Sequence, residues 1–288
     1  MAYAQNRGGR KAALRGILCF RWPEGGVCAN DLQNLGAAMN DIFFWAMAGL
    51  AAMLVGMGKG GLPVVGMLGV PVLSLAISPI TAAGLLLPVY VLSDIFALYA
   101  YRRAFDRRVL VILAAGVTLG VALGWATASV TPEWAVTLLV GLIGFIFALN
   151  LLRAKSGQAP RKADVPRGIF WGALTGFTSF VSHTGAPPFQ VYVLPLRLEK
   201  LVFAGTSTLL FAYLNAIKLI PYAALGQLSP ANLKVAAALM PVAALSVFFG
   251  VRLVKRLPER VFFQLVTWAL LFISAKLIWD GLRGSGWV

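Results

Sequence analysis

The stretches Gly60-Gly61-Leu62-Pro63 and Thr184-Gly185-Ala186-Pro187 lie 124 residues apart (60 to 184), and each interrupts a long apolar segment. Lipid offers no hydrogen-bond partner to an open backbone group, so non-helical chain at bilayer depth must be buried in protein or face a wet cavity. Paired interruptions at corresponding positions of two halves indicate the binding site of a solute transporter. We therefore expect a transporter whose site lies at these two breaks.

The composition predicts an all-α polytopic membrane protein. Of the 288 residues, 59% are hydrophobic and 12% are charged, which is outside the usual range of soluble domains. The net charge of +15 comes from basic residues in short loops between apolar segments. A nucleic-acid-binding protein would gather them on one soluble face, so we expect no nucleic-acid partner.

The apolar segments predict two inverted repeats, each a broken helix pair plus three full transmembrane helices. Six segments approach the ~20 residues needed for a crossing, and the shorter ones flank the two breaks. We expect repeats over residues 39–153 and 168–288, joined by a cytoplasmic linker over 154–167. Three crossings per half give the halves opposite topology. Residues 1–38 are predicted to be a disordered extension or no part of the native protein, whose start would be Met39.

Basic residues predict the orientation, because Lys and Arg accumulate in cytoplasmic loops. The loops at 130–133 and 225–230 contain neither residue and are expected on the outer side. The cytoplasmic loops are expected to carry Arg102, Arg103, Arg107 and Arg108; Arg153, Lys155, Arg161, Lys162 and Arg167; Arg197 and Lys200; and Arg252, Lys255, Arg256 and Arg260.

The breaks have the chemistry of an anion site. Pro63 and Pro187 are predicted to begin short helices, whose free N–H groups and positive dipole ends attract anions. Glycines allow the backbone to approach a ligand closely. The substrate-binding candidates at the breaks are Lys59, Gly60, Gly61, Pro63, Ser179, Ser182, His183, Thr184, Gly185 and Pro187. The alternative is that these glycines and prolines only kink and pack helices.

Polar residues inside the predicted spans are further candidates, because burying them in lipid is costly. Asp94 and Lys218 lie 124 residues apart (94 to 218). They could pair with each other, or Lys218 could hold substrate while Asp94 handles a proton; Asp94 could instead pair with Arg102 or Arg103. Thr206, Asn215 and Lys218 complete the predicted substrate site, and Asp94 and His183 are the candidates for proton coupling.

Neither a metal nor a cofactor is predicted. Cys19 and Cys28 both precede the first apolar segment, and His183 is the lone histidine. The ligands of a cysteine or histidine metal site are therefore missing from the predicted membrane body. His183 could equally be a neutral buried group.

The motifs at the breaks resemble those of the sulfite exporter family TauE/SafE, also described as the toluene-sulfonate uptake permease group. The resemblance runs from about Met39 to Leu282. Its most specific stretches are Gly56-Met57-Gly58-Lys59-Gly60-Gly61-Leu62-Pro63 and the segment from Gly176 to Pro188. The segment Gly205-Thr206-Ser207, followed by Asn215 and Lys218, also looks like the family's second-repeat helix. Lys59 stands where the family often has glycine.

The resemblance implies a multi-pass carrier of sulfite, sulfonates or related organosulfur anions in the bacterial inner membrane. We expect a secondary transporter that works by alternating access, with the anion and the lipid bilayer as partners and homo-oligomerisation left open. One alternative is a carrier of an unrelated small carboxylate. An intramembrane hydrolase using Ser182 and His183 is disfavoured, because adjacent residues seldom aim at each other and no carboxylate orients the histidine. A scaffold protein would not need buried charges.

Overall fold

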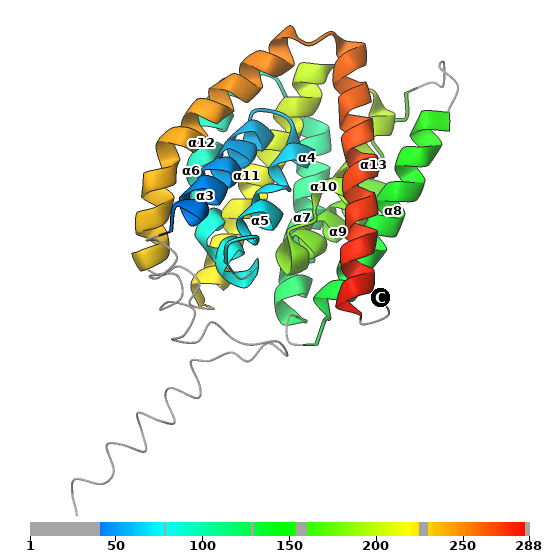
Figure 1. Cartoon of the computed structure of the whole chain (residues 1–288). Coiled ribbons are helices and arrows are strands. Elements are labelled where there is room, and N and C mark those ends of the chain that lie inside the picture. Colours follow the sequence, from blue (N-terminus) through cyan, green and yellow to red (C-terminus); the bar gives the residue numbers. More distant parts are fainter. Residues whose placement is uncertain (1–40, 78, 128–129, 154–159, 225–229, 286–288) are drawn as a thin grey trace, which may run out of the picture.

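The computed structural model describes residues 41–77, 79–127, 130–153, 160–224 and 230–285, and these residues form helices and short connections without strands (Figure 1). Seven helices are long and apolar enough to cross a membrane. The prediction of an all-α polytopic membrane protein is therefore confirmed. The predicted extension over 1–38, Met39, the first part of the linker and most of the loop after residue 224 lie outside the described residues.

The two halves have the same order of long and short helices. The helices of the first half are α3 (Ile42–Lys59), α4 (Pro63–Gly66), α5 (Gly69–Leu73), α6 (Pro79–Tyr101), α7 (Arg107–Ala126) and α8 (Glu133–Arg153). The helices of the second half are α9 (Val165–Ser182), α10 (Ala186–Val193), the 3₁₀ helix η1 (Leu194–Leu196), α11 (Lys200–Ala224), α12 (Pro230–Arg256) and α13 (Glu259–Gly284).

Aspartate side chains begin three of the long helices. Asp41, Asp106 and Asp164 each accept a hydrogen bond at 2.9 Å from a backbone N–H of the first turn of α3, α7 and α9. Such N-caps contribute about 1 kcal/mol each because they satisfy otherwise open donors. The cap at Asp164 places the start of α9 three residues before the expected start of the second repeat.

The first helix of the first broken pair extends up to the break. α3 has 18 residues and continues to Lys59, which makes it about 27 Å long at 1.5 Å per residue. Lys59 was predicted to lie at the break, and it is the last residue of this helix. The structure keeps Lys59 helical because its side chain is buried against a partner on α6.

Glycines let helices from different halves pack closely. A Cβ atom added to Gly120 on α7 would lie 1.9 Å from the carbonyl oxygen of Ala173 on α9. A Cβ added to Gly56 on α3 would lie 2.3 Å from the carbonyl oxygen of Ala243 on α12. A shift of 124 residues maps α3 onto α9 and α7 onto α12, so these two contacts are equivalent. The opposite membrane topology of the halves stays a prediction.

Hydrogen bonds join the basic loops at one end of the molecule. The backbone N–H of Arg161 donates to the carbonyl of Pro195 at 3.0 Å, and Lys200 donates to the carbonyls of Lys255 and Leu257 at the end of α12. The N–H of Asp106 donates to Thr206, near the start of α11, at 2.9 Å. This is the arrangement expected if all four loops face the cytoplasm.

Candidate functional site

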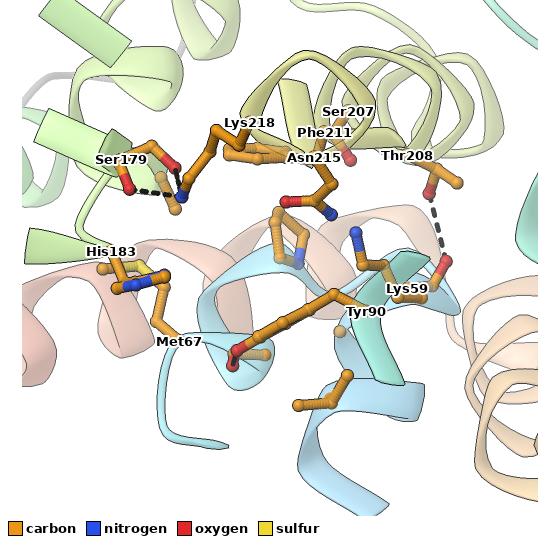
Figure 2. A pocket seen from close by; sticks show the side chains of 15 residues that line it. Lys59, Met67, Tyr90, Ser179, His183, Ser207, Thr208, Phe211, Asn215 and Lys218 are labelled. Atoms are coloured by element: carbon orange, nitrogen blue, oxygen red, sulfur yellow. Dashed lines mark hydrogen bonds between the residues drawn. The ribbon is translucent and has the colours of Figure 1, made fainter. Parts of the chain in front are cut away.

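A chamber of about 60 Å³ lies where the two breaks meet α6 and α11 (Figure 2). The ends of α3 and α9 contribute its charged and polar break residues, and α11 contributes one long face. The chamber is lined by Val55, Gly58, Lys59, Pro63, Gly66, Met67, Tyr90, Ser179, His183, Ala186, Ser207, Thr208, Phe211, Asn215 and Lys218. Six predicted substrate-site residues are among them: Lys59, Pro63, Ser179, His183, Asn215 and Lys218.

One side of the chamber holds a buried ion pair. The Nζ atom of Lys59 lies 2.6 Å from a carboxylate oxygen of Asp94, and the two residues are 6% and 4% exposed. The Asn215 amide donates to the other carboxylate oxygen at 2.9 Å. Lys59 also lies 5.3 Å from the centre of the Tyr90 ring, within the range of a cation–π contact. Asp94 therefore connects both halves of the chain.

The partner of Asp94 differs from those that the sequence suggested. We expected Lys218, or else Arg102 or Arg103, because they lie in an equivalent helix or two turns away. The ion pair is with Lys59, at the end of α3. Lys59 is the last residue of α3, and the packing of α3 against α6 brings its amine to Asp94. No regular spacing in the sequence indicates that these two residues pair.

The other side of the chamber holds Lys218. Its Nζ atom donates to the carbonyl oxygen of Ser179 at 2.5 Å and lies 3.3 Å from the Ser179 hydroxyl oxygen. Lys218 is 1% exposed in the folded chain and is nevertheless among the residues that line the chamber. Counted at their formal charges, Lys59, Lys218 and Asp94 give the chamber one net positive charge.

The residues of the second break line two different cavities. His183 ends α9 in the left-handed conformation, with φ 55° and ψ 20°, and its side chain lines the chamber. The hydroxyls of Ser182 and Thr184 lie 2.7 Å apart. These two residues line a separate, larger cavity together with His183.

Several predicted site residues pack the breaks and do not line the chamber. The carbonyl of Gly60 accepts a hydrogen bond from Tyr101 at 2.6 Å, and Gly60 lies against Gly250 of α12. Gly61 has φ 111° and faces the Tyr101 hydroxyl. Thr206 accepts the bond from Asp106 described above.

Gly185 and Pro187 also have packing contacts. A Cβ on Gly185 would lie 2.8 Å from the Cβ of Ser179, and Pro187 lies beside Gly144 of α8. For the glycines, Pro187 and Thr206, the packing alternative describes the observed contacts better than the binding prediction does.

The predicted short helices are present, but the first is too short to supply a strong dipole. α4 begins at Pro63 as predicted and has four residues, whereas α10 begins at Ala186, with Pro187 in its first turn, and has eight. A helix dipole sums over aligned peptide units, so one turn contributes little. The charge at the first break therefore comes chiefly from the Lys59 side chain.

Among the chamber residues that the sequence reasoning missed are Met67, Tyr90, Thr208 and Phe211, and Ser207 was named without being placed in the site. Helical spacing could have found most of them. Thr208, Phe211, Asn215 and Lys218 follow one face of α11, and Tyr90 is one turn before Asp94 on α6. Thr208 also donates to the backbone carbonyl of Lys59 at 3.1 Å, which fixes the end of α3 against α11.

The chain matches a known protein family. The family model for the sulfite exporter TauE/SafE matches residues 42–277, which span both breaks and every chamber residue. The chain belongs to the TauE/SafE family. TauE/SafE proteins are membrane transporters and not enzymes, so this chain is a multi-pass membrane transporter, as the motifs predicted. Comparisons with curated proteins and with solved structures give no match.

Proposed function

We propose that the protein carries sulfite, a sulfonate or a related small organosulfur anion across the bacterial inner membrane by alternating access. The anionic group binds in the chamber, between Lys59 and Lys218. The observation that carries this proposal is the presence of two buried lysine amines at one small cavity with a single carboxylate beside them. Burying charge is costly, and the cost is offset when an anion completes the site.

The volume of the chamber limits the group that fits. One water needs about 10–15 Å³ of cavity volume, so a cavity of 60 Å³ takes about four to six groups of that size. A sulfur with three oxygens has four non-hydrogen atoms and fits. Any larger organic part of a substrate has to extend outside the chamber.

The Lys59–Asp94 pair suggests how proton movement couples to anion binding. The carboxylate of Asp94 forms an ion pair with the Lys59 amine, which is the group that an incoming anion would bind. When Asp94 takes up a proton, the attraction to Lys59 is lost and the amine becomes available to the substrate. Proton uptake and anion binding then favour each other, which is the requirement for coupled transport. His183 is the second candidate for this proton.

Binding to the purified full chain in detergent tests the proposed site. Thermal-shift measurements would compare sulfite, methanesulfonate, thiosulfate, sulfate and acetate. We expect one of the sulfur anions to raise the melting temperature selectively, and Lys218→Met to abolish the shift. Lys234→Met is the matched control, because Lys234 is an exposed lysine on α12 that lines neither cavity. A shift that survives in Lys218→Met contradicts the site, and a shift with acetate alone would favour the carboxylate alternative.

Flux into liposomes tests the coupling. An imposed proton gradient should drive accumulation of the bound anion by the unmodified protein. Asp94→Asn should still exchange the anion but should no longer accumulate it against its gradient. If accumulation persists in Asp94→Asn and is lost in His183→Gln, His183 carries the proton instead.

A further inference from the structure

A second cavity of about 580 Å³ lies beside the chamber and reaches the protein surface. It runs between α5, the start of α8 and the last turns of α13. Its outer rim includes Glu133, Lys276 and Asp280, and the last two form an ion pair with side chains that are 44% and 41% exposed. Its inner part is mostly apolar, with Leu68, Pro71, Ile273 and Leu277 among the lining residues. We call this cavity the vestibule.

The vestibule opens at the end of the molecule opposite the basic loops. Glu133 begins α8, whereas Arg153 at the other end of that helix belongs to the basic end. Gly284, the last residue of α13, also lines the vestibule and lies beside Trp134 at the start of α8. By the positive-inside rule the vestibule faces the outside of the cell.

Met67 and His183 line both the chamber and the vestibule. Each comes from one break: Met67 follows the last residue of α4, and His183 follows the last residue of α9. Figure 2 shows both side chains on the same side of the chamber, away from Lys59. The methionine side chain is flexible, whereas the histidine is held by a backbone conformation that few non-glycine residues adopt.

The side of the chamber toward the basic loops is closed by different means. Tyr101 donates to the Gly60 carbonyl at 2.6 Å, and Thr208 donates to the Lys59 carbonyl at 3.1 Å. Gly60 packs with its Cα against Gly250 of α12. Opening this side requires two hydrogen bonds from side chains to backbone carbonyls to break and helix contacts to separate, whereas the vestibule side requires two side chains to move.

We propose that Met67 and His183 form the barrier between the chamber and an outward-facing vestibule, and that the anion passes between them. This inference rests on the proposed function for the identity of the solute. The barrier and the vestibule themselves are properties of the described residues and can be tested without any substrate. The two residues would set which solutes enter from the outside, because every solute that reaches Lys218 by this route passes them.

Cysteine labelling from the outer face tests the barrier. The full chain would carry Cys19→Ser and Cys28→Ser, which removes both native cysteines. A single cysteine is then placed in the chamber by Ser207→Cys or, as the matched control, in the vestibule by Ser74→Cys. The reagent is a membrane-impermeant anionic methanethiosulfonate added outside intact cells.

We expect Ser74→Cys to react readily and Ser207→Cys to react slowly. His183→Gly and Met67→Ala should each speed the labelling of Ser207→Cys by about tenfold, which corresponds to a barrier lowered by about 1.4 kcal/mol. His183→Gly removes the side chain and keeps a residue that suits φ 55°. Ser182 lines the vestibule and not the chamber, so Ser182→Ala should leave the labelling rate of Ser207→Cys unchanged.

Three results would overturn the barrier. Ser207→Cys could react as fast as Ser74→Cys in the otherwise unmodified background. Both His183→Gly and Met67→Ala could leave the slow rate unchanged. The chamber cysteine could react faster when the reagent is added from the cytoplasmic side of inverted vesicles. If labelling follows the expected pattern while no anion binds, the barrier stands and the proposed substrate class falls.

Discussion

Replacing one member of the Lys59–Asp94 pair is expected to destabilise the protein strongly. The charges are 2.6 Å apart and both residues are almost fully buried. At that distance they attract by about 6 kcal/mol if the effective dielectric constant is about 20. Removing water from each ion costs several kcal/mol, so the intact pair contributes little net stability. Removal of one partner leaves the other buried without compensation.

We therefore expect Asp94→Asn and Lys59→Met each to lower the free energy of unfolding by about 3–5 kcal/mol. The double variant should lose about 2 kcal/mol or less, because no charge then stays buried at this position. The coupling energy between the two sites should accordingly be about 4 kcal/mol or more, above the usual range of about 0.5–3 kcal/mol for residues in contact. Asparagine at position 94 can still accept the hydrogen bond from Asn215, so the change reports mainly on charge.

The assay is reversible unfolding of the purified protein in mixed detergent micelles, followed by helical circular dichroism. The exposed Lys276–Asp280 pair on α13 is the control, and its removal should cost about 0.2–1 kcal/mol. Additive effects of Asp94→Asn and Lys59→Met would refute the reasoning, because two residues that do not interact would behave in that way.

Three further substitutions test the packing of the breaks and helices. Gly120→Ala should cost about 1–3 kcal/mol of unfolding free energy because its Cβ would overlap an α9 carbonyl, whereas Gly49→Ala, with nothing within 4 Å, should cost nothing; equal values would contradict the close helix contact. Tyr101→Phe should cost about 1–3 kcal/mol, measured in the same unfolding assay, because the buried Gly60 carbonyl loses its donor. Gly61→Ala should lower the melting temperature, since φ 111° is strained for any residue with a side chain and the Cβ would lie 2.6 Å from the Tyr101 hydroxyl; an unchanged melting temperature would count against that backbone conformation.

The sequence was sufficient for the helical class and for the location of a cavity at the two breaks. Long apolar segments can cross a bilayer only as helices or closed barrels, so the class follows from the composition. The two breaks contain Pro63 and Pro187, whose fixed φ suits the start of a helix, and short helices do begin there. The chamber lies where these helix interruptions meet.

The partners inside the site could not be predicted, because they depend on how helices from different parts of the chain cross. Asp94 has basic residues nearby in sequence, yet its partner is Lys59 on another helix. For a related reason, the sequence did not indicate that Gly60 and Gly61 contact other helices. A glycine that allows a ligand to approach and one that allows a helix to approach look the same in sequence, and only the position of α12 distinguishes them.

The contact between α3 and α12 has a consequence for the order of events during synthesis. α3 is the first described helix to leave the ribosome, and the helix that covers Gly56 begins only at Pro230. The early helices are therefore inserted before they reach their final packing. The glycine surface of α3 is covered only after α12 has been synthesised. A nascent chain stopped before Pro230 would contain every helix of the first half and still could not close around the ion pair in its native packing.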